Sequence, residues 1–296
     1  ANAMITQRHV HVSVAWKTPQ FALVWLVLCL NVSAGIGILG MASPLLQEVF
    51  AGKLLGNDLT FSQLDAAQLA QIAAIAAGFT GLLSLFNIGG RFFWASFSDY
   101  LGRKNTYFVF FALGFALYAM IPNLGHLGNV SLFVAAFCII LSMYGGGFAT
   151  VPAYLADLFG TQMVGAIHGR LLTAWAAAGV LGPVLVNYLR EYQLKMGVER
   201  AAAYDTTWDI LSGLLALCII CNLLVRPVAD KYFMTDAELA AEQALGHDKG
   251  ADASTSLEWK AAPGSQPLVI AAWLAVGIPL LWGVWVTVQK TAVLFH

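Results

Sequence analysis

Residues Asn87 to Asn105 read NIGGRFFWASFSDYLGRKN. The stretch begins inside a long apolar run, where Arg91 stands, and ends in a short charged turn that starts eight residues later. A charge well inside a membrane-length helix is costly and marks a functional candidate by default. The turn holds an acid, a glycine and two bases within six residues: Asp99, Gly102, Arg103 and Lys104. This spacing predicts a tight loop between two membrane helices. Gly102 would relieve backbone strain in the turn, and the charges would pair across the loop between the two helix ends.

The composition is that of a membrane protein. Apolar residues make up 59% of the 296 positions and charged residues 10%, and the mean hydropathy is +0.73. Soluble domains carry about 25% charged residues, and a soluble chain this apolar would expose large patches and aggregate. The formal net charge of −1 gives no basic field for nucleic acid.

Apolar runs of membrane length predict an all-α integral membrane fold with a six-helix bundle. The expected spans are Phe21–Phe50, Ala67–Phe97, Thr106–Ile121, Val130–Leu158, Gly165–Leu189 and Trp208–Val225, the third of them stopped by Pro122. The chain then divides into a cytoplasmic N-terminal segment (1–20), the bundle (21–225), a cytoplasmic linker (226–266) and one extra transmembrane helix (267–290). The linker is polar and is expected to hold a short helix, Asp236–Leu245.

The distribution of bases sets an orientation. Placing the Arg103-Lys104 turn in the cytoplasm puts nine Lys and Arg residues on that side, at positions 8, 17, 103, 104, 170, 226, 231, 249 and 260. The other side holds five, at positions 53, 190, 195, 200 and 290. The N-terminus is therefore expected to be cytoplasmic, and the protein to lie in a bacterial inner membrane.

The turn Ser98–Lys104, SDYLGRK, resembles the loop signature of the major facilitator superfamily, a glycine-and-aspartate motif that ends in Gly-Arg-Lys or Gly-Arg-Arg. Ala95 or Ser96 stands where the motif usually has a glycine before the aspartate. More narrowly, three stretches resemble the oxalate/formate antiporter family: NIGGRFFWASFSDYLGRKNTY from Asn87, PAYLADLFG from Pro152 and GAIHGRLLTAWAAAG from Gly165. The last helix, with VGIPLLWGVWVTVQK, resembles a single-helix unit that accompanies some of these transporters or is fused to them.

The resemblance implies an architecture and a partner. Members of the family have twelve core helices in two six-helix bundles, with the substrate between them. The order of motifs here matches the second bundle, so residues 21–225 are expected to be the C-terminal half of such a fold. Residues 1–20 would be the loop between the halves. The partner would be an N-terminal six-helix half, in the same chain or a separate one.

Five residues are the candidate substrate-binding set: Asn87, Arg91, Tyr144, Phe148 and Trp175. An arginine suits a planar, two-pronged grip on a carboxylate, and Asn87 lies one helical turn before it. The alternative for Arg91 is a side chain that extends to the cytoplasmic surface. For Asn87 and the three aromatic residues the alternative is ordinary packing or lipid contact. The charged turn, Asp99 to Lys104, is interpreted as gating and topology residues.

The resemblance also bears on the substrate. Oxalate-handling members of the family use two buried bases, and Arg91 matches the first, whereas the second falls at Trp175, which is not basic. One buried cation balances one negative charge, and a second anionic group would be left unpaired. The sequence therefore favours a monocarboxylate such as formate, lactate or pyruvate over oxalate. A base from the other half would reverse that preference.

Three other classes of protein are alternatives to a transporter. A seven-helix retinal-type protein would need a lysine midway along its last helix, but Lys290 lies at the end. A membrane-embedded enzyme would need His, Cys or carboxylate side chains clustered at one depth, and the six His lie in loops or tails. A non-catalytic half or interaction subunit would apply if this chain is made alone. No cofactor or metal is expected.

The orientation predicts the outcome of cysteine labelling in intact cells. Single cysteines at Asp58 and Lys195 should react with an impermeant maleimide from outside, and one at Asn105 only after the membrane is permeabilised, because the bases hold the Asn105 turn in the cytoplasm. Labelling of all three from one side would contradict the orientation.

Overall fold

The computed structural model describes residues 4–244 and 266–295. Within these residues six helical spans are long and apolar enough to cross a membrane. They are α2 (Pro19–Phe50), α3 (Ala66–Leu101), α4 (Arg103–His126), α5 (Val130–Phe159), the pair α6 (Val164–Leu171) and α7 (Thr173–Lys195), and α8 (Asp205–Leu224). The described part contains no strand. The predicted all-α membrane class is confirmed.

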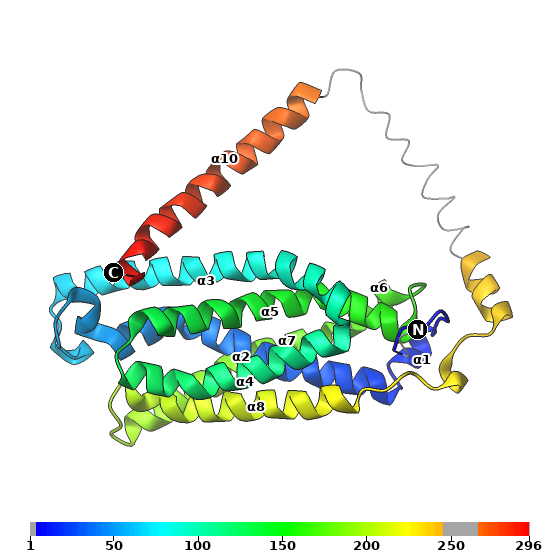
Figure 1. The fold of residues 1–296 in the computed structure, drawn as a ribbon, viewed down its shortest axis with the longest axis horizontal. Coiled ribbons are helices and arrows are strands. Elements are labelled where there is room, and N and C mark those ends of the chain that lie inside the picture. The colour runs from blue at the N-terminus through cyan, green and yellow to red at the C-terminus, as the bar shows by residue number, and fades with distance from the viewer. Residues whose placement is uncertain (1–3, 245–265, 296) are drawn as a thin grey trace.

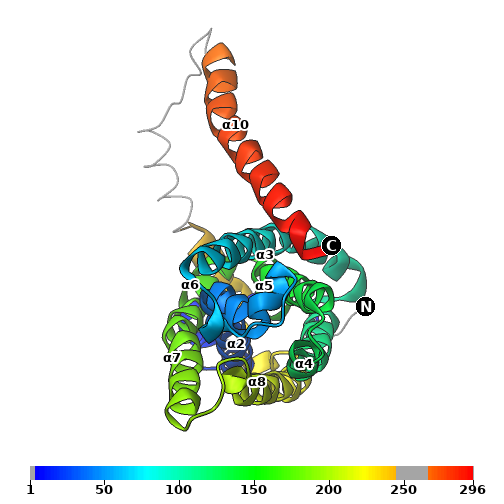
Figure 2. The same ribbon diagram turned by 90° about the vertical axis from the view of Figure 1, so that its left-hand side faces the viewer.

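The six spans run side by side along the length of the bundle (Figure 1). Viewed from one end, α2 and α5 lie toward the middle, with α3, α4, α7 and α8 around them (Figure 2). The burial of the helices agrees with this arrangement, because α2 and α5 are the most buried spans and α3 and α7 the most exposed. Among the six spans, α3 and α7 therefore have the most surface left for contacts outside the bundle.

Glycines let α3 and α5 approach until their backbones touch. A Cβ atom on Gly145 would overlap the carbonyl oxygen of Asn87, and one on Gly90 would overlap a carbonyl oxygen of α5. A Cβ atom on Gly146 would lie 2.5 Å from that of Trp94. Small residues at such contacts are the usual means of packing membrane helices, because lipid provides no hydrophobic drive for association. This contact fixes the height of α3 relative to α5.

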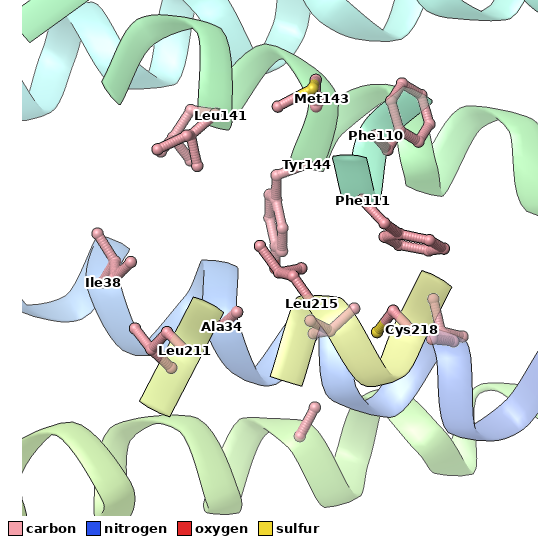
Figure 3. Packing of buried hydrophobic residues seen from close by; sticks show 14 of the residues in the cluster. Ala34, Ile38, Phe110, Phe111, Leu141, Met143, Tyr144, Leu211, Leu215 and Cys218 are labelled. Atoms are coloured by element: carbon pink, nitrogen blue, oxygen red, sulfur yellow. The ribbon is translucent and has the colours of Figure 1, made fainter. Parts of the chain in front are cut away.

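The pair α2 and α7 packs in the same way. A Cβ atom on Gly182 would overlap the carbonyl oxygen of Ser33, and one on Gly37 would lie 2.9 Å from the carbonyl oxygen of Gly182. A Cβ atom on Gly35 would overlap the ring of Tyr144, which projects from α5 toward the core (Figure 3). Tyr144 thus joins α5 to α2.

Aromatic and aliphatic side chains fill the rest of the core. Phe110 and Phe111 enter it from α4, and Leu211, Leu215 and Cys218 from α8 (Figure 3). The four cysteines are all buried and free. Cys218 and Cys221 are therefore packing residues, since a reactive thiolate needs accessible, electropositive surroundings.

Two helix boundaries differ from the expectation. The third span does not stop at Pro122, because α4 continues to His126 with the proline inside its last turn. A missing backbone donor near a helix end costs little when neighbouring helices and loop groups satisfy the carbonyl it leaves free. The fifth span is broken at Leu172, where α6 ends and α7 begins.

The N-terminal segment closes the end of the bundle that carries the Arg103 turn. Its backbone bonds the C-terminal end of α5, with Thr6 N donating to Asp157 O at 2.9 Å and Val10 N to Phe159 O at 2.9 Å. Arg8 forms an exposed ion pair with Asp230 at 2.8 Å. Residues 236–244 form a helix, which lies within the short helix expected over Asp236–Leu245. Residues 245–265 of the expected linker lie outside the described residues.

The last helix, α10 (Gln266–Thr291), follows the linker and ends in a short 3-10 turn, η5 (Ala292–Phe295). Its C-terminal end contacts the N-terminal half of α3, and the helix then leans away from the bundle (Figure 1). Among the described residues its apolar part, Trp273–Gln289, is shorter than the six spans. That α10 crosses the membrane remains a prediction.

The glycine contact predicts a difference between two Gly→Ala variants. Gly145→Ala should lower the free energy of unfolding by about 1–3 kcal/mol, because its Cβ displaces the α3 backbone. Gly213→Ala, in mid-helix with nothing within 4 Å of its Cβ, should be neutral or stabilising by up to about 1 kcal/mol. Thermal unfolding of the purified chain in detergent measures both. Equal stability of the two variants would contradict the backbone contact.

Candidate functional site

Arg91 lies exposed in the last third of α3, toward the end that carries the charged turn. Its Nε donates to Oδ1 of Asn87, one turn earlier, at 3.4 Å. Its guanidinium carbon lies 5.9 Å from the ring centroid of Phe148 on α5. In the described part of the chain no carboxylate lies within ion-pair distance of Arg91. The guanidinium is therefore held by an amide and a ring but is not neutralised.

Three aromatic residues continue from this contact across the bundle. The Phe148 ring packs edge-on against Tyr144 at 5.3 Å and against Trp175 at 5.4 Å between centroids. Tyr144 is buried, whereas Trp175, near the start of α7, is 45% exposed. The structure thus joins all five predicted residues in one row of contacts from α3 through α5 to α7, called here the Arg91 row.

The Arg91 row depends on the glycines of α5. Asn87 O lies directly against Gly145, and Tyr144 and Phe148 stand on either side of the Gly145–Gly147 run. An arginine beside aromatic rings and away from acids offers a planar, two-pronged donor in apolar surroundings. Such a donor can bind a carboxylate with two charge-assisted hydrogen bonds. Such an arrangement is chemically suited to binding an anion without covalent change.

The charged turn has the predicted geometry. Gly102 ends α3 and begins α4 with φ of 84°, a conformation that favours glycine. Arg103 forms an ion pair with Asp99 and also donates to the hydroxyl of Ser98. The Arg103 side chain is 18% exposed and that of Asp99 64%. The predicted pairing of charges across the turn is confirmed.

Lys104 has a different environment from Arg103. Its Nζ donates to the carbonyl oxygens of Leu223 at 3.1 Å and Val225 at 2.7 Å, at the C-terminal end of α8. Asn222 donates to Lys104 O at 2.9 Å and accepts from the Tyr154 hydroxyl at 3.2 Å. A cation at a helix C-terminus is favourable because the last carbonyls have no partners within the helix. Lys104 therefore ties α4 to α8.

A cluster at the opposite end of the bundle was missed by the sequence analysis. Glu48, near the end of α2, is 5% exposed and forms ion pairs with Arg190 of α7 and with Arg200 at 3.2 Å. The Tyr204 hydroxyl donates to Glu48 Oε2 at 2.8 Å and accepts from Arg190 Nε at 2.8 Å. The available signal was an acid inside an apolar run, since Glu48 falls within the first expected span. Its partners lie more than a hundred residues away in the chain, so no local pattern indicates them.

These observations define a class. Within the described residues, six apolar spans of membrane length are those of an integral membrane protein. Residues 3–183, more than half of the chain, match the Major Facilitator Superfamily, and the chain belongs to that superfamily. The match confirms the resemblance predicted from the charged turn.

One curated protein is similar to this chain over part of its length. The chain is similar to the oxalate:formate antiporter of Oxalobacter formigenes, with 28% identity over 167 residues. The similarity covers 56% of this chain and 35% of that protein. The chain therefore spans about a third of the length of the relative it matches.

The Glu48 cluster predicts a large loss of stability from one neutral substitution. Glu48→Gln should lower the free energy of unfolding by about 3 kcal/mol, because it leaves the largely buried Arg190 without its counter-charge. Asp58→Asn removes an exposed charge at the same end and should change stability by less than about 0.5 kcal/mol. Chemical denaturation in mixed micelles compares the two variants. Equal effects would show that the cluster does not hold α2 to α7.

Proposed function

We propose that this chain forms part of a secondary transporter of small organic anions, in which Arg91 binds the carboxylate of the substrate. The observation that carries the proposal is the guanidinium of Arg91, held against Phe148 and Asn87 and paired with no carboxylate of the described residues. The cations that hold helix ends together are bonded within the protein, Arg103 and Arg190 to acids and Lys104 to backbone carbonyls. A substrate anion supplies the missing charge when it binds.

The single cation favours a monocarboxylate, of the formate, lactate or pyruvate type. Trp175 occupies the position where the resemblance implies a second base, and its ring packs on Phe148. No Lys or Arg lies between Leu171 and Leu189 in the sequence. A second carboxylate placed against this aromatic wall would have no partner here and would lose its hydration. Exchange of oxalate for formate is the alternative, supported by the curated relative, and it requires a base from outside this bundle.

The transport cycle requires a second six-helix bundle, in the same chain or in a partner chain. Three observations support it: α3 and α7 are the most exposed spans, the Arg91 row opens between them, and the chain spans about a third of its relative. Rocking of the two bundles would expose the site to each side in turn, by antiport or by proton symport. A non-catalytic half that awaits such a bundle is the alternative from another class.

The charged turn is the proposed cytoplasmic gate of this cycle. Asp99 is the exposed member of its ion pair, so it can exchange Arg103 for a base on the second bundle when the two halves close. This role places the turn and the N-terminus in the cytoplasm, and the protein in a bacterial inner membrane. Tyr144 and Phe148 would form the wall of the site, and Lys104 would hold α4 and α8 together as a unit.

Substitution of Arg91 tests the proposal. Arg91→Gln should weaken carboxylate binding roughly 10- to 150-fold, the value of one charge-assisted hydrogen-bonded contact. Membrane insertion should be unchanged or improved, because a charge within a membrane-length helix is removed. Arg91→Lys keeps the charge but loses the planar two-pronged contact, so its affinity for the carboxylate should lie between those of the wild type and Arg91→Gln. Uptake of labelled formate by the complete transporter in proteoliposomes is the measurement. Arg8→Gln, which loses an exposed ion pair, is the matched control.

Normal uptake by Arg91→Gln would place the anion site elsewhere. Trp175→Lys is the companion variant, because a second cation in the row should shift preference from one-carboxylate to two-carboxylate anions. Competition of oxalate and formate against a labelled substrate reports that shift. An unchanged preference would show that Trp175 does not line the anion site.

A further inference from the structure

An apolar groove runs along α3 on the side opposite to Arg91. It is lined by Leu82, Leu85, Phe86, Gly89 and Phe93 of α3, with Ile139 and Ser142 of α5 as its second wall. Val288 of α10 already lies at one end of it. Arg91 is nine residues beyond Leu82, which at about 100° per residue places it half a turn of the helix away. A bundle that closes over Arg91 therefore leaves this groove uncovered.

Exposed apolar side chains follow the groove along α3. Phe86 is 43% exposed, Phe93 60% and Phe97 41%. Leu82, Phe86, Gly89, Phe93 and Phe97 recur at intervals of three and four residues, the spacing of a single stripe on a helix. Gly89 interrupts the stripe, and nothing lies within 4 Å of a Cβ atom placed on it. The α3 stripe thus has a notch in its centre.

A matching stripe lies on α10. Trp273, Gly277, Leu281, Val284 and Val288 recur at the same three- and four-residue intervals. Trp273 is 74% exposed and Leu281 67%, and a Cβ atom on Gly277 also meets nothing within 4 Å. The α10 stripe therefore carries a notch of its own, one helical turn from a large side chain.

We propose that α10 docks along this groove, antiparallel to α3, as a helix of the folded chain in the membrane. Thr287 lies against Gly81, where an added Cβ would be 2.6 Å from its methyl group, and the next residue, Val288, lines the same groove as Leu82. The proposed register sets Val288 opposite Leu82, so that in an antiparallel pair Val284 meets Phe86. The pivot is the buried C-terminal end of the chain, where Thr291 ends α10 and Leu294 lies in η5.

The register pairs each notch with a large side chain. Leu281 of α10 falls opposite Gly89 of α3, and Phe93 of α3 falls opposite Gly277 of α10. Trp273 then meets Phe97 at the far end. Small residues facing large ones allow close helix packing in lipid, where van der Waals contact supplies much of the association energy. This complementarity favours α10 of the same chain over a second copy or over lipid as the occupant.

Disulfide crosslinking tests the docked register in the full chain. The pair Phe86→Cys and Val284→Cys should crosslink on mild oxidation in native membranes, since the proposal places the two side chains face to face. Trp282→Cys with Phe86→Cys is the matched control, because Trp282 lies on the opposite face of α10 and is 68% exposed. The four native cysteines are buried, and variants with one added cysteine measure their background.

A protease site inserted after Gly250 identifies which chains are joined. After cleavage on a non-reducing gel, the expected result is one band for the Val284 pair and two fragments for the Trp282 control. Two fragments from both pairs, or equal crosslinking of both, would overturn the proposal. A band of two-chain mass would also overturn it and would assign the groove to a second copy.

Filling the notch gives a second, independent test. Gly89→Leu in the Val284 crosslinking background should abolish the crosslink, because two leucines would then meet at one position. Adding Leu281→Gly restores the fit with the large and small partners exchanged, and should restore the crosslink. Size-exclusion elution confirms that each variant is folded. Crosslinking that survives Gly89→Leu would contradict the proposed register.

Discussion

Backbone contact between α3 and α5 determines where Arg91 lies. The two helices meet through Gly90, Gly145 and Gly146, at positions where any side chain would overlap the neighbouring backbone or the Trp94 side chain. Because lipid gives no hydrophobic drive for helix pairing, close van der Waals contact is the main source of stability at this interface. The same contact sets Asn87 and Arg91 level with Tyr144 and Phe148. Packing and site are thus consequences of a single feature of the sequence.

The charges of the bundle fall into two groups with different environments. At the end with the charged turn, Arg103 is paired with Asp99 and Lys104 is bonded to the end of α8. At the other end, Glu48 is paired with two arginines. These groups hold helix ends together. Arg91 differs from them, since it lies between the ends and has no acid partner among the described residues. Arg91 is exposed on α3, so its guanidinium is accessible to a ligand, and this difference supports the proposed anion site.

The sequence predicted the helices better than their ends. Apolar runs and the bases between them were sufficient for six spans, because the bilayer requires a fixed length of apolar helix. The continuation of α4 past Pro122 and the break at Leu172 were not predictable, since both depend on contacts with neighbouring segments. Arg91 was recognisable from its apolar surroundings. Its contact with Phe148 and Trp175 was not, because that contact depends on how closely three helices approach one another. Glu48 was overlooked because its partners are remote in sequence.

The central claim is that close packing of α3 and α5 presents the guanidinium of Arg91 to a carboxylate. Solid-state NMR of the transporter reconstituted in lipid, with ¹⁵N-labelled arginine and ¹³C-formate, measures that contact directly through dipolar dephasing. If Arg91 binds the carboxylate, the wild type should show dephasing at hydrogen-bond range. The dephasing should be lost in Arg91→Lys and weakened in Gly145→Ala. Dephasing that persists without an arginine at Arg91, or that is absent from a wild-type protein saturated with formate, would contradict the account.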